Sequence, residues 1–166
     1  MVFDLIACNG TKRTYYILNG ESISPYDFSV TSNATTQYRK FGIKYSDNAT
    51  VLTSDEANRP GTYYTYIPVP DINLDDCNTL CFVMSCERFN TATLSINILQ
   101  NGSDYPDENL KRVIDISNDG KKMVYKIPLD NLLADEYSIY GITLTATYQY
   151  VLENLPTVKI YQIYAE

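Results

Sequence analysis

Apolar and polar residues alternate along the stretch 78–100, and this alternation is the clearest structural signal in the chain. Apolar residues occupy every second position in both halves of the stretch, at Leu80, Phe82, Met84 and Cys86 and then at Ala92, Leu94, Ile96 and Ile98. A period of two indicates β-strands, because successive side chains leave a strand on opposite faces. The short polar break 87–90 predicts a long antiparallel hairpin. Since a hairpin cannot bury its apolar face alone, a second sheet must cover it.

Shorter alternating stretches on both sides of this hairpin predict further strands, separated by turn residues. The expected strands cover residues 2–7, 13–18, 37–45, 63–69, 110–116, 122–129, 139–150 and 157–164. We expect one face of a strand to carry Met123, Tyr125, Ile127 and Leu129, and the interior to receive Ile142, Leu144 and Ala146. This pattern predicts an all-β fold, an antiparallel β-sandwich of the jelly-roll type. The connections are too short for interdomain linkers, so we expect a single domain over residues 1–166.

Charge and hydropathy exclude several classes of partner. The net charge of −7 gives no attraction to phosphates, so we expect neither nucleic acid nor an anionic membrane surface as a partner. The first ten residues have no basic segment and do not resemble a signal peptide. No uncharged apolar run approaches the roughly 18 residues that a membrane helix needs, so no membrane insertion is expected.

The four cysteines and the acidic loops give little reason to expect a metal. Cys81 and Cys86 have opposite parity on one strand, and Cys77 lies too far from Cys81 in an extended chain to bridge it, whereas a pairing of Cys8 stays open. Without histidine or a CxxC pair, a zinc site is not expected. The stretch 71–76 resembles the start of a calcium loop but lacks the required glycine and glutamate, so a looser calcium site and a plain acidic turn both stay open. We expect no cofactor and mostly free thiols.

The chain lacks the usual constellations of catalytic residues. The absence of histidine removes Ser-His-Asp and Cys-His nucleophiles, and no glycine-rich nucleotide loop is present. A glycosidase needs only two carboxylates, but the acidic residues cluster in loops where solvated side chains are the default. We therefore expect a protein that is not an enzyme, with a carboxylate-pair glycosidase as a remote alternative.

In the order of its strands the chain resembles the jelly-roll carbohydrate-binding modules and their galactose-binding-like relatives. The resemblance covers about the last two thirds of the sequence, and the stretches that carry it are NTLCFVMSCE, TATLSINIL, GKKMVYKIPL, YGITLTATY and TVKIYQIYA. Where the family has an aromatic residue at the start of a strand, this chain has Met123 or Val124, and it has no tryptophan for sugar stacking. Near Gln162 it lacks the aspartate that often helps the family hold calcium.

Tyrosine, with 16 residues, is the aromatic residue that a sugar would meet. Its ring offers apolar area and its hydroxyl a polar contact, although β-rich proteins favour tyrosine for packing as well. The strand order that the resemblance implies would bring together the expected ligand-binding residues, which are Tyr63, Tyr64, Tyr66, Arg39, Asn97, Tyr148 and Tyr150. The competing interpretation is that half of these tyrosines pack in the core or at strand ends.

The same sandwich serves in phage tails, baseplates, head fibres and capsid decoration proteins, and this chain, rich in Tyr, Thr and Asn and free of Trp, looks similar to those. We expect a non-catalytic interaction module of a phage virion, which is either a capsid decoration, head-fibre or tail and baseplate domain or a receptor-binding domain that holds a cell-surface glycan. The alternative is a carbohydrate-binding module of a secreted glycan-active enzyme. The expected partners are other virion proteins or further copies of the chain, and the expected location is the virion or the outside of the cell. An uncharged outer row offers a face for assembly, formed by Thr93, Ser95, Asn97, Thr143, Thr145 and Thr147.

Overall fold

A computed structural model of the chain describes residues 15–19, 38–46, 48–54, 59–67, 78–129, 132, 136–150 and 152–166. The regular structure of these residues is all β-strand, and none of them forms a helix of the length and apolarity needed to cross a membrane. The predicted strand at 2–7, the acidic stretch 71–76, Cys8 and Cys77 lie outside the described residues. Within the described part, Cys81 and Cys86 are buried free thiols, as expected.

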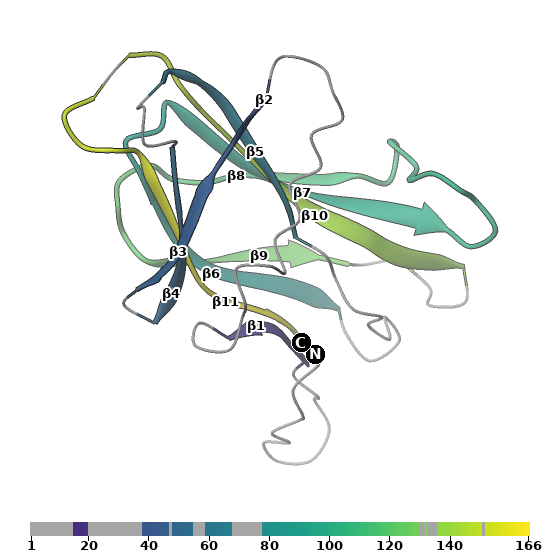
Figure 1. The fold of residues 1–166 in the computed structure, drawn as a ribbon. Helices are drawn as coiled ribbons and strands as arrows, with labels where there is room; N and C mark the ends of the chain where they lie inside the picture. The colour runs from purple at the N-terminus through teal and green to yellow at the C-terminus, as the bar shows by residue number, and fades with distance from the viewer. Residues whose placement is uncertain are drawn as a thin grey trace, which may run out of the picture.

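The strands form two sheets that face each other, which confirms the predicted β-sandwich (Figure 1). The six-stranded sheet contains β1 (Tyr15–Asn19), β3 (Gly42–Ser46), β4 (Ala49–Thr53), β6 (Thr79–Glu87), β9 (Met123–Pro128) and β11 (Thr157–Ala165), with β11 between β6 on one side and β4 and β1 on the other. The five-stranded sheet has the order β2 (Tyr38–Lys40), β5 (Gly61–Ile67), β10 (Tyr137–Tyr148), β7 (Thr91–Gln100) and β8 (Arg112–Asp115). The pairings are antiparallel except that β2 runs parallel to β5. A single domain over the whole chain stays a prediction.

The predicted hairpin between the strands of the 78–100 stretch is wrong, although both strands exist. Strand β6 pairs with β9 and β11, whereas β7 pairs with β8 and β10 in the other sheet. The connection 87–90 therefore carries the chain across the sandwich, with Arg88 at a φ of 66° and Phe89 buried in the core. The apolar faces of β6 and β7 cover each other from opposite sheets, because this arrangement buries both, whereas a hairpin would place them side by side on one surface.

The core contains the alternate residues that the pattern assigned to the interior. Each apolar position of β6 and β7 named above is buried, and so are Ile142, Leu144 and Ala146 of β10. Burial of each aliphatic side chain contributes about 1.5–3 kcal/mol relative to exposure. The expected face is confirmed for Tyr125 and Ile127 of β9 and for Leu129, which follows the strand, but Met123 at the start of β9 is 42% exposed.

Candidate functional site

The outer face of the five-stranded sheet is lined by small hydroxyl side chains and two tyrosines. Because Ile142, Leu144 and Ala146 point inward, Thr143, Thr145 and Thr147 of β10 point outward. In the ladder with β5 these three lie opposite Tyr66, Tyr64 and Thr62, and in the ladder with β7 they lie opposite Ser95, Thr93 and Thr91. The Oγ1 atoms of Thr62 and Thr147 are hydrogen bonded at 3.0 Å. An uncharged surface with many donors and acceptors thus borders a pair of aromatic rings.

A pocket of about 540 Å³ opens on this face, a size typical of sites for small ligands. Three strands and one connecting loop line it, through Tyr64 and Tyr66 of β5, Asn97 of β7, Tyr140 and Thr143 of β10, and Pro106 and Glu108 of the loop between β7 and β8. Aromatic rings and polar groups therefore converge from β5, from β10 and from β7 with the loop that follows it, three parts of the chain that are well separated in the sequence.

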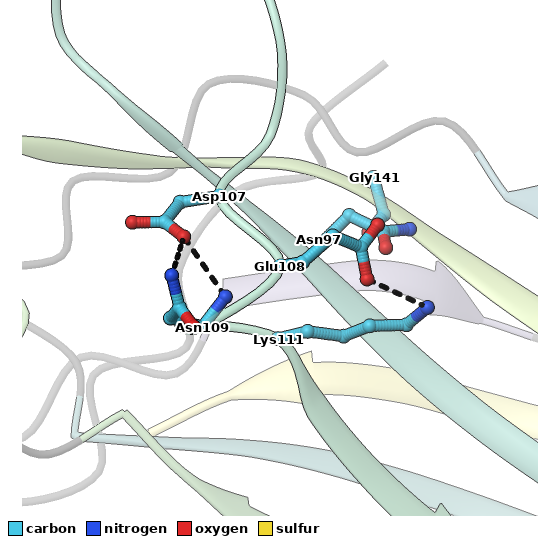
Figure 2. Close-up of polar contacts among 6 residues, drawn as sticks. All are labelled: Asn97, Asp107, Glu108, Asn109, Lys111 and Gly141. Carbon is cyan, nitrogen blue, oxygen red and sulfur yellow. Dashed lines mark hydrogen bonds and ion pairs between the residues drawn. The ribbon is translucent and has the colours of Figure 1, made fainter.

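The loop between β7 and β8 is held in place mainly by its own polar contacts (Figure 2). The backbone N–H of Asp107 donates to the carbonyl of Ile98 at 2.9 Å, which ties the loop to β7. The Oδ1 of Asp107 accepts from the backbone N–H of Asn109 at 2.8 Å and from its Nδ2 at 3.0 Å. These bonds bring Pro106 and Glu108 to the wall of the pocket.

The charges at the pocket nearly cancel. The carboxylate of Glu108 lies 3.5 Å from the ammonium of Lys111, and the Glu108 side chain is 79% exposed. An ion pair this exposed contributes little to stability, but it leaves the wall without net charge. Lys40 lies opposite Tyr64 in the ladder between β2 and β5 and is not among the residues that line the pocket.

Tyr66 is fixed more firmly than an ordinary surface tyrosine. Its hydroxyl donates to the carbonyl of Tyr140 at 2.6 Å. Burial raises the pKa of the Tyr66 hydroxyl, and the neighbouring hydroxyls of Tyr140 and Tyr64 raise it further. Tyr66 is therefore a neutral ring and a bonded hydroxyl at physiological pH.

The structure brings together three of the expected ligand-binding residues, which are Tyr64, Tyr66 and Asn97. Tyr63 and Tyr148 do not belong with them, because they are 0% and 1% exposed and their rings stack in the core with centroids 5.8 Å apart. For these two the expectation is corrected, since a ring enclosed by the core cannot contact a ligand. The packing interpretation accounts for both.

The two remaining candidates lie elsewhere. The Nε of Arg39 donates to the carbonyl of Pro60 at 3.2 Å, and Arg39 faces Tyr63, not Tyr64, in the register of β2 with β5. Tyr150 is 73% exposed and follows the end of β10, ten positions along the chain from Tyr140. Neither residue lines the pocket.

Sequence reasoning missed Tyr140, Pro106 and Glu108. Tyr140 shares the parity of the inward Ile142, so strict alternation would bury it. The glycine that follows it within the strand was a usable signal, because an isolated glycine in a strand often marks a β-bulge. Glu108 belongs to a loop whose acidic residues carry no periodic signal. Among the described residues, no three His, Cys, Asp or Glu side chains gather as a metal site would require, and the expected lack of a metal stays a prediction.

Comparison with known proteins identifies relatives in fold only. No family model and no curated protein matches the chain. The agarase AgWH50C superimposes with a TM-score of 0.55 at 11% identity over 92% of this chain, which spans 24% of the agarase chain. The xylan-binding module CBM86 from Roseburia intestinalis gives 0.47 at 13% identity, covering 95% of this chain and 96% of its own.

A family 11 carbohydrate-binding module of the cellulosomal cellulase Lic26A-Cel5E of Clostridium thermocellum gives a TM-score of 0.48 at 12% identity, covering 75% of this chain and 79% of its own. At identities this low the likeness concerns the fold alone. Of these three structures, the agarase is the one whose TM-score exceeds 0.5, so it is the superposition on which the shared β-sandwich fold rests.

Proposed function

We propose that this chain is a non-catalytic module that binds a neutral glycan on the outer face of its five-stranded sheet. The observation that carries the proposal is the pocket of about 540 Å³ in which the rings of Tyr64, Tyr66 and Tyr140 meet the polar side chains of Asn97 and Glu108. Sugars combine an apolar C–H face, which stacks on aromatic rings, with hydroxyls that need polar partners. The lining offers both kinds of contact.

The charge of the site favours an uncharged ligand. Glu108 supplies the charge among the lining residues, and Lys111 offsets it from 3.5 Å. The chain as a whole carries −7, so an acidic polysaccharide meets net repulsion on approach. A neutral polysaccharide meets none. Beyond Thr143, the outward hydroxyls of Thr145, Thr93 and Ser95 continue the surface, and they would contact further sugars of a longer chain.

The carboxylates at the pocket support binding without catalysis. Glycosidases place two carboxyl groups about 5–9.5 Å apart around the scissile bond. Among the described residues that line the pocket, Glu108 is the single carboxylate, so the lining does not contain the carboxylate pair that a glycosidase uses.

Binding to a panel of polysaccharides tests the proposal directly. Affinity gel electrophoresis with xylan, mixed-linkage β-glucan and agarose is expected to retard the wild-type chain, whereas polygalacturonate is expected not to. Tyr64→Ala should remove the retardation, because it removes a ring from the pocket. Tyr150→Ala is the matched control, since it deletes an exposed tyrosine that does not line the pocket. Retardation by polygalacturonate alone, or equal loss in both variants, would contradict the proposal.

The virion role has no supporting observation in the structure or among the similar proteins, and it stays a prediction. Light scattering of the purified chain separates it from the proposed module. A trimer or larger closed assembly would favour the virion role, because such proteins act as symmetric oligomers. A monomer that binds polysaccharide would favour the module.

A further inference from the structure

We infer that Gly141 is a positioning residue of this glycan site, because the space left by its missing side chain holds the Tyr66 ring in the pocket. The inference rests on the proposed function for its ligand, but its geometry can be tested without one. Gly141 itself is buried and does not line the pocket, so it would act entirely through its neighbours.

Gly141 lies where the ladder between β10 and β7 shifts register. Ile139 pairs with Ile98 and Gly141 pairs with Asn97, which leaves Tyr140 as the extra residue of a β-bulge. The bulge breaks the alternation of β10 and turns Tyr140 toward the pocket, where it is 48% exposed. One irregularity of the strand thus supplies one of the three rings.

The same β-bulge also determines the position of a second ring, that of Tyr66. A Cβ atom on Gly141 would overlap the Cε2, Cζ and hydroxyl oxygen of Tyr66, so the phenol end of Tyr66 occupies the volume that any other side chain would fill. The Tyr66 hydroxyl donates to the carbonyl of the preceding residue, Tyr140, at 2.6 Å. Space on one side and a hydrogen bond on the other fix the ring before a ligand arrives, and this lowers the entropy cost of binding.

The backbone of the bulge also orients a polar group. The carbonyl of Gly141 accepts from the Nδ2 of Asn97 at 3.5 Å, and Figure 2 shows the two residues together. Two consecutive carbonyls, those of Tyr140 and Gly141, therefore hold Tyr66 and Asn97. Because the proton of the Tyr66 hydroxyl points at Tyr140, the ligand contacts Tyr66 by stacking on its ring and receives no hydrogen bond from it.

Four variants test the inference: Gly141→Ala, Tyr66→Ala, the double variant, and Gly42→Ala as control. Gly42 is a strand glycine in the other sheet, where a new Cβ meets the movable Oγ1 of Thr53 at 3.0 Å. Gly141→Ala should weaken binding by about tenfold to whichever neutral polysaccharide retards the wild type. The reason is that the new methyl group displaces the Tyr66 ring, and a misplaced contact group stabilises a ligand much less. Gly42→Ala should leave binding unchanged. The double variant should bind and resist urea as Tyr66→Ala does, since the added methyl group then has room.

Alkaline titration gives a readout that needs no ligand. The Tyr66 phenolate signal, identified by its loss in Tyr66→Phe, should appear above the ordinary tyrosine pKa in the wild type because of burial and the nearby Tyr140 and Tyr64. In Gly141→Ala it should return toward the ordinary value. An unchanged titration, or strictly additive effects of the two single substitutions on stability, would overturn the inference. If the wild type binds none of the polysaccharides, the proposed function fails, while the titration and the urea series still decide the position of Tyr66.

Discussion

Two groups of aromatic residues lie on opposite faces of the same sheet and differ in almost every physical property. The inner group comprises Phe41, Tyr63, Phe89 and Tyr148, whose ring centroids are 5.5–6.4 Å apart in the core. The outer group comprises Tyr64, Tyr66 and Tyr140, which surround a pocket. Tyr63 and Tyr64 are neighbours in the sequence, so a single step along β5 separates a ring packed in the core from a ring that lines the pocket. Residue type does not decide the role of a tyrosine here, whereas the face of the strand does.

The largest expected difference in stability is between two variants that each remove one ring, one from the inner group and one from the outer group. Tyr63→Ala should lower the free energy of unfolding by about 3–5 kcal/mol, because it opens a cavity in the core. It also removes the hydrogen bond from the Tyr63 hydroxyl to the carbonyl of Arg59, at 2.9 Å. Tyr64→Ala should lower the free energy of unfolding by only about 1 kcal/mol, because Tyr64 is half-buried and its removal opens no cavity in the core. Urea unfolding of both variants measures these changes. Similar losses of unfolding free energy in the two variants would show that the inner and outer rings do not differ in their contribution to stability.

Alkaline pH should distinguish the core from the outer face. Burial, and then the charge of Glu87, raise the pKa of the Cys86 thiol to about 12 from 9.0. The contribution of the neutral thiol to stability is fully present below pH 9 and is lost as pH rises toward 12, by about 1.4 kcal/mol for each pH unit.

The comparison of wild type with Cys86→Val isolates the pH-dependent contribution of the Cys86 thiol to stability. Urea midpoints measured from pH 8 to 10 should fall more steeply in the wild type, because the variant lacks the thiol whose pKa is raised on folding, whereas the tyrosines with raised pKa values are present in both proteins. Parallel curves would mean that the thiol titrates as it does in the unfolded chain.

The smallest effect on stability is expected at the rim of the pocket. Lys111→Met should change the free energy of unfolding by less than about 0.5 kcal/mol, since the pair with Glu108 is exposed. It should, however, leave the Glu108 carboxylate uncompensated, and binding to a neutral polysaccharide should stay unchanged because that ligand carries no charge. Urea unfolding and gel retardation on neutral polysaccharides measure the two quantities on one preparation. A loss of stability as large as that of Tyr63→Ala would show that the loop belongs to the core.

The alternation of apolar residues was enough to predict the sandwich, most of the described strands and most interior positions. It did not predict β4 as a strand, it joined β2 and β3 into one strand, and it placed the half-exposed Met123 inside. It could not identify the partner of each strand, because a period of two describes which face is apolar and not which strand lies beside it. The break 87–90 was short enough for a hairpin, yet the buried ring of Phe89 shows that the chain crosses the core there.

The site was predictable only in part. Tyr63 shares its parity with the buried Thr65 and Ile67, so the alternation of β5 alone separates it from Tyr64 and Tyr66. Tyr140 could not be found this way, because the bulge reverses the direction of its side chain. Glu108 depends on the path of a loop, which local hydrogen bonds of Asp107 determine and which no periodic pattern records.

The loop between Gln100 and Arg112 is tied to the sheet by backbone bonds from Asn101 and Asp107, and most of its residues are exposed. Pro106, Asp107 and Lys111 are half-buried, and Leu110 packs against the core. The exposed positions of the loop can therefore vary with little effect on folding. Loops of other sequence grafted between Gln100 and Arg112 would change one wall of the pocket while the rings of Tyr64, Tyr66 and Tyr140 stay in place.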